Sequence, residues 1–122
     1  MVIGRNCELL AVTMGYAPAS RCDNRWNMKY AAIIQYTSDA SVIAGARPAH
    51  RVYLSGLQEQ GKLVISGPFA DDRGGLLVYE ADTSEQVESM IAQDPFATSG
   101  VFVSWEIRPW NVVFVNQKLL CK

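Results

Sequence analysis

The sequence has few of the residues that build metal sites or disulfide frameworks: one histidine and three cysteines among 122 residues. Cys7, Cys22 and Cys121 lie near the ends of the chain, outside its regularly patterned part. A zinc site needs closely paired ligands, so we expect no metal site. An odd cysteine count without regular spacing favours a reducing cytoplasm over secretion, although a bond between Cys7 and Cys22 stays open.

The sequence also lacks a charge excess and a long hydrophobic run. Its 11 Lys and Arg and 12 Asp and Glu residues give a formal net charge of -1, and no basic run occurs. We therefore expect neither nucleic acid nor membrane as a partner. Apolar stretches are interrupted within about 10 residues, too short to cross a bilayer. The hydrophobic content of 49% nevertheless supports one domain with a real core.

The predicted organisation is a poorly ordered N-terminal extension at 1–27, one domain at 28–115 and a tail at 116–122. The extension carries Arg5, then a weak apolar run and small residues, which is the order of a signal peptide. Glu8, however, precedes the apolar run, and Thr13 and Gly15 dilute it. We therefore favour an extension, or translation that starts at the methionine opening the domain.

The first part of the domain predicts a strand followed by a helix. Residues 28–36 are apolar and aromatic, as in a strand, and 37–46 are expected to form a loop. Pro48 suits the first helical turn, where the N–H that proline lacks would have no partner. Gly61 is a good stop residue, so the predicted helix covers 48–60.

The second part predicts two strands, a helix and further strands. The turn residues from Asp71 to Gly75 predict a hairpin with a loop longer than the minimum. Thr83 opens a capping box, and Pro95 ends the helix near residue 93. The expected elements are strands at 63–66 and 76–79, a helix at 84–93, a turn or helical stub at 96–100, a strand at 101–107 that Pro109 interrupts, and an extended edge segment at 110–115.

The order strand, helix, strand, strand, helix, strand predicts an α+β fold. This is the ferredoxin-like βαββαβ arrangement, an antiparallel sheet with both helices on one face. The other face would be exposed in a monomer, and strands rich in Ile, Val, Phe, Trp and Tyr indicate that it is covered. A second copy of the chain covers it most simply, so we expect a homodimer.

Short motifs in a fixed order resemble the YCII-related (YciI-like) family over residues 28–115. They are Arg47-Pro48-Ala49-His50, Gly61-Lys62-Leu63, Ser66-Gly67-Pro68, Asp94-Pro95-Phe96 and Gly100-Val101-Phe102. The resemblance implies a ferredoxin-like subunit of the dimeric α+β barrel type, a homodimer, and an active site centred on a His and an Asp. A chlorinated-hydroquinone dehydrochlorinase belongs to this family. The loop at 71–75 is shorter than in typical members, so the resemblance implies no substrate for this chain.

The histidine, His50, is the first candidate for catalysis. At about 100° per residue it falls on the apolar side of its helix with Tyr53, Leu54 and Leu57. Imidazole transfers protons near neutral pH, so a partnered His50 facing a cleft would be an acid or base. The alternative is a core histidine that serves packing alone.

Asp94 is the best candidate partner for this histidine. It follows the second helix, whose negative end disfavours a carboxylate unless a cation such as a protonated His lies nearby. The alternative is that Asp-Pro merely ends the helix. Asp71 and Asp72 are rival partners, because their loop could reach a pocket.

Four residues are candidates for substrate binding. Arg47 could bind a carboxylate. Ser66 could donate to a substrate oxygen, and Gly67 allows close backbone approach. Asp71 lies in the loop that could border the pocket. The aromatic residues could line a ring-binding pocket or pack in the core.

Together these features predict a small cytoplasmic homodimeric enzyme that needs neither a metal nor an organic cofactor. It would perform proton-transfer chemistry, namely elimination, isomerisation or hydrolysis, on a small organic molecule, with His50 and Asp94 as the catalytic pair. The alternative is a ligand-binding or regulatory dimer without turnover. A haem-linked role would require His50 to ligate iron.

Overall fold

The computed structural model describes residues 28–120, and the predicted extension and all three cysteines lie outside this range. Residues 28–110 form one compact unit. Beyond it, the described part of the chain contains the short 3-10 helix η3 (Gln117–Leu119). The compact unit holds all the candidate site residues.

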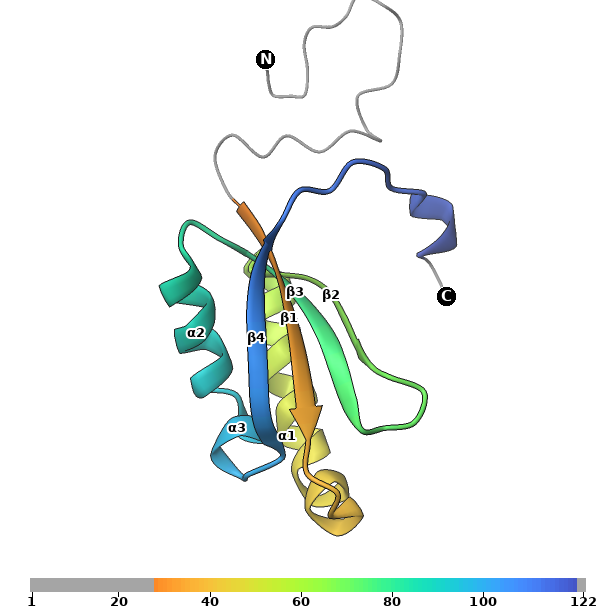
Figure 1. Ribbon diagram of the computed structural model, residues 1–122, viewed down its shortest axis with the longest axis vertical. Helices are drawn as coiled ribbons and strands as arrows, with labels where there is room; N and C mark the ends of the chain where they lie inside the picture. Colours follow the sequence, from red (N-terminus) through yellow and green to blue (C-terminus); the bar gives the residue numbers. More distant parts are fainter. Residues whose placement is uncertain (1–27, 121–122) are drawn as a thin grey trace, which may run out of the picture. The chain divides into compact units, whose positions relative to one another are not determined.

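The order of the elements in this unit confirms the predicted fold, with one short helix added. They are β1 (Met28–Tyr36), α1 (Ala40–Glu59), β2 (Leu63–Pro68), β3 (Gly74–Ala81), α2 (Ser84–Ala92), α3 (Pro95–Thr98) and β4 (Phe102–Trp110). The four strands pair in the order β2-β3-β1-β4, and every pairing is antiparallel (Figure 1). This is a ferredoxin-like α+β fold of the dimeric α+β barrel type.

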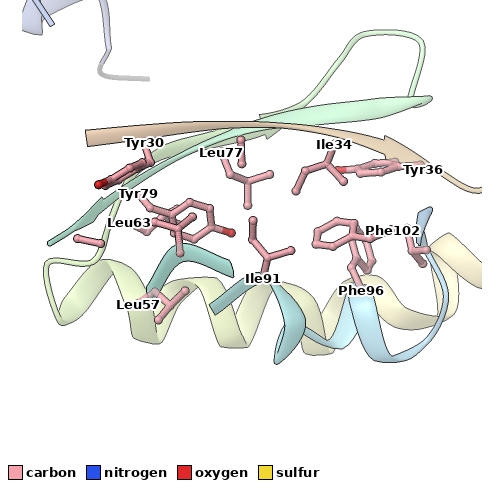
Figure 2. Close-up of a cluster of buried hydrophobic side chains, with 14 of the residues drawn as sticks. Tyr30, Ile34, Tyr36, Leu57, Leu63, Leu77, Tyr79, Ile91, Phe96 and Phe102 are labelled. Atoms are coloured by element: carbon pink, nitrogen blue, oxygen red, sulfur yellow. The ribbon is translucent and has the colours of Figure 1, made fainter. Parts of the chain in front are cut away.

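The core lies between the sheet and the helices (Figure 2). Successive side chains of a strand point to opposite faces, so alternate residues of β1 enter this layer. Tyr30, Ile34 and Tyr36 are buried there, whereas Ile33 lies on the other face of the sheet. The capping box is also present, since the Thr83 hydroxyl accepts from the backbone N–H of Gln86 and starts α2.

The predicted start of the first helix was wrong, because α1 begins at Ala40 and runs through Pro48. Its N-cap is Asp39, whose carboxylate accepts hydrogen bonds from the backbone N–H groups of Ser41 and Val42. Capping thus satisfies the first orphan N–H donors of the helix inside the segment expected to be a loop. Pro48 is exposed, so the helix carbonyl that loses its partner there can be hydrated.

The predicted end of the last strand was also wrong. β4 continues through Pro109 to Trp110, and Pro109 lies opposite Tyr30 in β1. β4 is an edge strand, the place in a sheet where proline is tolerated, because an edge strand pairs on one side only. Residues 111–115, predicted as an extended edge segment, form no strand.

Candidate active site

The structure brings His50 and Asp94 together. His50 lies on the sheet-facing side of α1 and is 7% exposed, while Asp94 is fully buried between α2 and α3. The Nδ1 atom of His50 is 2.7 Å from Oδ1 of Asp94. This distance is in the range of charge-assisted hydrogen bonds. A carboxylate has no proton to give, so Nδ1 donates and the imidazole presents Nε2 as its basic nitrogen.

Asp94 is held in place by a second hydrogen bond. It is the N-cap of α3, and its Oδ1 accepts from the backbone N–H of Phe96 at 2.9 Å. Pro95 occupies the first turn of α3, where proline is preferred. The Asp-Pro sequence therefore marks the start of α3 as well as the end of α2. The carboxylate stays at this point because it both caps a helix and holds the imidazole.

Aromatic rings fix the plane of the imidazole. The ring of Phe96 is stacked on His50, with centroids 3.8 Å apart and an interplanar angle of 4°. Phe102 meets the imidazole edge-on at 6.0 Å. The sequence alone did not assign this contact to either ring. The motif Asp94-Pro95-Phe96 nevertheless contains a signal for it, because an aromatic ring two residues after the carboxylate can approach the imidazole from the same direction as the carboxylate. The stack leaves the imidazole little freedom to rotate.

The second imidazole nitrogen remains open. Nε2 has no hydrogen-bond partner within residues 28–120, and it is not among the fully buried unpaired atoms there. The His50 side chain as a whole is 9% exposed, so the imidazole is largely but not completely enclosed. The pair therefore has one nitrogen held and the other free, the arrangement that a general base requires.

Burial and the charge of Asp94 act together on three tyrosines. Burial raises the pKa values of Tyr36, Tyr53 and Tyr79, and the negative charge of Asp94 raises each of them further. For Tyr36 the Arg47 guanidinium acts in the opposite direction. All three hydroxyls consequently stay protonated at neutral pH and can act as hydrogen-bond donors.

A cavity of about 610 Å³ opens beside this cluster. Tyr36 and Ile43 form part of its wall, and Asp71 and Asp72 contribute from the loop between β2 and β3. His50 is not in the wall. Tyr36 connects the two regions, because its ring also packs edge-on against Phe96, with centroids 5.6 Å apart.

The predicted substrate-binding residues divide into two groups. Arg47 and Asp71 lie near the cavity: the Arg47 guanidinium contacts Asp72 Oδ1 at 2.9 Å, and Asp71 accepts from the backbone of the same loop. Ser66 and Gly67 lie on the edge strand β2, are exposed, and do not line the cavity. Their part in binding stays a prediction.

The described residues show neither a metal-ligand cluster nor a membrane-spanning helix. Within residues 28–120, no three His, Cys, Asp or Glu side chains are placed to hold a metal ion together. None of the helices in this range has the length and hydrophobicity to span a membrane.

The fold and the site define a class: small ferredoxin-like α+β domains in which a buried carboxylate holds a histidine beside a cavity. This chain belongs to the YCII-related domain family, whose model matches residues 28–111. It is 39% identical over 51 residues to YjpA of Bacillus subtilis. This matched segment covers 42% of this chain and 60% of YjpA. It thus spans less than two thirds of YjpA.

The matches to two further relatives cover a larger share of each relative's length. The chain is 27% identical over 78 residues to YciI of Escherichia coli O6:H1 and of Shigella flexneri, covering 56% of this chain and 80% of each relative. A similar solved structure is 5-chloro-2-hydroxyhydroquinone dehydrochlorinase (TftG) from Burkholderia phenoliruptrix AC1100, in complex with 2,5-dihydroxybenzoquinone. It has a TM-score of 0.61 and 26% identity, covering 69% of this chain and 94% of that chain.

Proposed function

We propose that this protein is a small cytoplasmic homodimeric enzyme that performs acid–base chemistry on a hydroxylated small molecule without a cofactor. The observation that carries the proposal is the 2.7 Å contact between His50 Nδ1 and Asp94 Oδ1, with Nε2 left open. The dehydrochlorinase with a similar fold, solved with a dihydroxybenzoquinone, supports a hydroxylated ring as the substrate class.

In the proposed step, Nε2 of His50 takes a proton from a substrate hydroxyl. The Asp94 carboxylate stabilises the imidazolium that forms and keeps Nδ1 protonated. The electron pair of the broken O–H bond then forms a C=O bond in the substrate. In an elimination, the displaced electrons leave with an anionic leaving group; in an isomerisation, His50 returns the proton to another substrate atom.

The cavity supplies the proposed binding site. Arg47 and Asp72 form a pair whose side chains are 28% and 48% exposed. An anionic group on the substrate would compete with Asp72 for the guanidinium, because a fork of N–H donors suits a carboxylate or phenolate. Asp71 borders the same space, and Tyr36 lies between it and the Phe96 ring. A substrate bound there would have to reach the imidazole past Tyr36, because His50 is not in the wall of the cavity.

The open face of the sheet supports the proposed homodimer. The register places Ile33 of β1 opposite Leu76 of β3, and Ile65 of β2 shares the same face. These side chains are 41%, 37% and 42% exposed in one chain. Contiguous apolar surface of this kind usually marks an interface, and a second copy presents the same face.

One observation favours a second candidate, a ligand-binding dimer without turnover. The wall of the cavity does not include His50, so a ligand can be held without contact with the imidazole. This candidate predicts saturable binding of hydroxylated rings that is the same in the wild type and in a His50 variant.

Substrate screening separates the two candidates. Wild-type protein and His50→Gln are incubated with chlorinated and unchlorinated hydroxyhydroquinones, and chloride release and ring absorbance are followed. We expect turnover by the wild type and a loss of about 10²- to 10⁴-fold in His50→Gln. Arg51→Gln, at the exposed neighbouring position on α1, is the control and keeps its activity. Binding without turnover in every variant would support the ligand-binding dimer instead.

A further inference from the structure

Two polar atoms in the core have no hydrogen-bond partner within the described residues. They are the hydroxyl of Tyr79 and Oδ2 of Asp94, and both residues are 0% exposed. An unpaired buried hydroxyl or carboxylate oxygen costs about 1–3 kcal/mol or more. One is a donor and the other an acceptor, so a contact between them would satisfy both.

The fold points these two groups into the same layer. Tyr79 belongs to β3 and faces the helices, and Figure 2 shows its hydroxyl pointing toward the middle of the core, near Ile91. Ile91 lies in the last turn of α2, three residues before Asp94, which follows the end of that helix. The charge of Asp94 is also one of the causes that raise the pKa of Tyr79, as expected for groups that lie near each other.

The other polar side chains from the neighbouring elements either have a different hydrogen-bond partner or lie elsewhere in the core. From α1, His50 binds Oδ1 and the Tyr53 hydroxyl donates to the backbone carbonyl of Met90 at 2.8 Å. From β1, the Tyr36 hydroxyl lies beside Gly75. The Tyr79 hydroxyl, on β3, is therefore the remaining candidate hydrogen-bond donor for Oδ2 of Asp94.

We propose that one internal water molecule bridges the Tyr79 hydroxyl and Asp94 Oδ2, which makes Tyr79 a positioning residue for the His50–Asp94 pair. Its catalytic consequence rests on the proposed function; the bridge itself does not. A buried water needs two to four polar partners, and these two groups supply the first two. Tyr79 donates to the water, and the water donates to Oδ2.

The bridge sets the strength of the bond between carboxylate and imidazole. A hydrogen bond to Oδ2 stabilises the charged carboxylate and draws part of its charge away from Oδ1. When the bridge is lost, the charge concentrates on Oδ1, which then accepts more strongly from Nδ1.

The experiment uses the fact that the chain has a single histidine, so one imidazole spectrum reports on the pair. In Tyr79→Phe we expect the Nδ1 proton resonance of His50 to move downfield, and kcat with an accepted substrate to fall while KM stays the same. The matched control is Tyr30→Phe. Tyr30 lies opposite Tyr79 in the register, and Figure 2 shows its hydroxyl at the outer end of the cluster. It should leave both measurements unchanged.

An unchanged Nδ1 resonance in Tyr79→Phe, or an equal shift in Tyr30→Phe, would overturn the bridge. If Tyr79→Phe does not fold, a high-resolution crystal structure of the wild type decides: an ordered water within hydrogen-bond distance of both groups supports the proposal, and a direct contact or an empty gap contradicts it. The NMR and crystallographic measurements need no substrate. Their failure is therefore distinguishable from a failure of the proposed function.

Discussion

At the scale of residues, each contact of the His50 imidazole restricts it in a different way. Asp94 sets which nitrogen carries the proton, and the Phe96 ring sets the plane. A histidine that served packing alone would need neither a charged partner nor an open Nε2. Burying a carboxylate is costly, so its presence opposite this ring favours a role for the pair beyond stability.

Replacing Asp94 by Asn tests that role. The amide can still cap α3 but cannot stabilise an imidazolium, so we expect activity to fall by about 10²-fold or more and stability by about 1–3 kcal/mol. Turnover and urea unfolding measure the two effects.

The matched control for this variant is Asp39→Asn. Asp39 caps α1 in the same way but contacts no histidine, and Asn is an equally good N-cap. It should change neither quantity noticeably. Wild-type activity in Asp94→Asn would show that Asp94 acts only as a cap.

The sequence could predict the two polar members of the site but not its surroundings. Helical periodicity placed His50 on the inner side of α1, and a short family motif indicated Asp94. The stacking of Phe96 and the direction of the Tyr79 hydroxyl depend on how β3 and α3 approach α1, which no local pattern encodes. The same is true of Ser66 and Gly67, whose motif is present although their strand lies away from the cavity.

At the scale of elements, local signals predicted the order of the strands and helices but misplaced two ends. Pro48 and Pro109 both predict a boundary in the sequence, yet each lies inside its element. The capping carboxylate of Asp39 outweighs one missing helical hydrogen bond, and an edge strand tolerates one missing donor. Whether a strand lies at an edge is a property of the whole sheet, so the sequence alone could not show it.

Close packing at the start of β3 gives a prediction about glycine. A Cβ on Gly75 would lie 2.8 Å from the Tyr36 hydroxyl and 3.0 Å from the Gly67 carbonyl oxygen, whereas a Cβ on Gly67 would meet nothing within 4 Å. We expect Gly75→Ala to lose about 1–3 kcal/mol of unfolding free energy and Gly67→Ala to change it little. Urea unfolding of both variants measures this, and similar stabilities would contradict the packing described for Tyr36.

At the scale of the whole molecule, buried tyrosines give stability a dependence on alkaline pH. The pKa of Tyr79 is raised well above 10.0, mainly by burial, while in the unfolded chain it ionises near that value. The folded state therefore binds the Tyr79 proton more tightly than the unfolded state does. The resulting contribution to the free energy of unfolding is complete below pH 10 and is lost as the pH rises further.

Urea unfolding at pH 9 and pH 11 measures this loss. For Tyr79 the expected slope is about 1.4 kcal/mol per pH unit above the unfolded value. In Tyr79→Phe that part of the slope should disappear, while Tyr30→Phe should keep it. The same slope in all three proteins would contradict the burial of the Tyr79 hydroxyl.

Assembly is the second property of the whole molecule. A charge at the centre of the open sheet face should prevent association, so we expect the wild type to sediment as a dimer and Ile33→Glu as a folded monomer. Val52→Glu, a change on an exposed side of α1, is the control and should remain dimeric. A monomeric wild type, or a dimeric Ile33→Glu, would show that this face is not the interface.

Chemical rescue of His50→Ala tests the central claim, proton transfer by the paired imidazole, most directly. With a substrate that the wild type accepts, we expect His50→Ala to lose about 10²- to 10⁴-fold in turnover. Added free imidazole should restore part of it in a saturable way, because the space between Asp94 and Phe96 matches the missing ring. Full turnover by His50→Ala without imidazole would contradict the account.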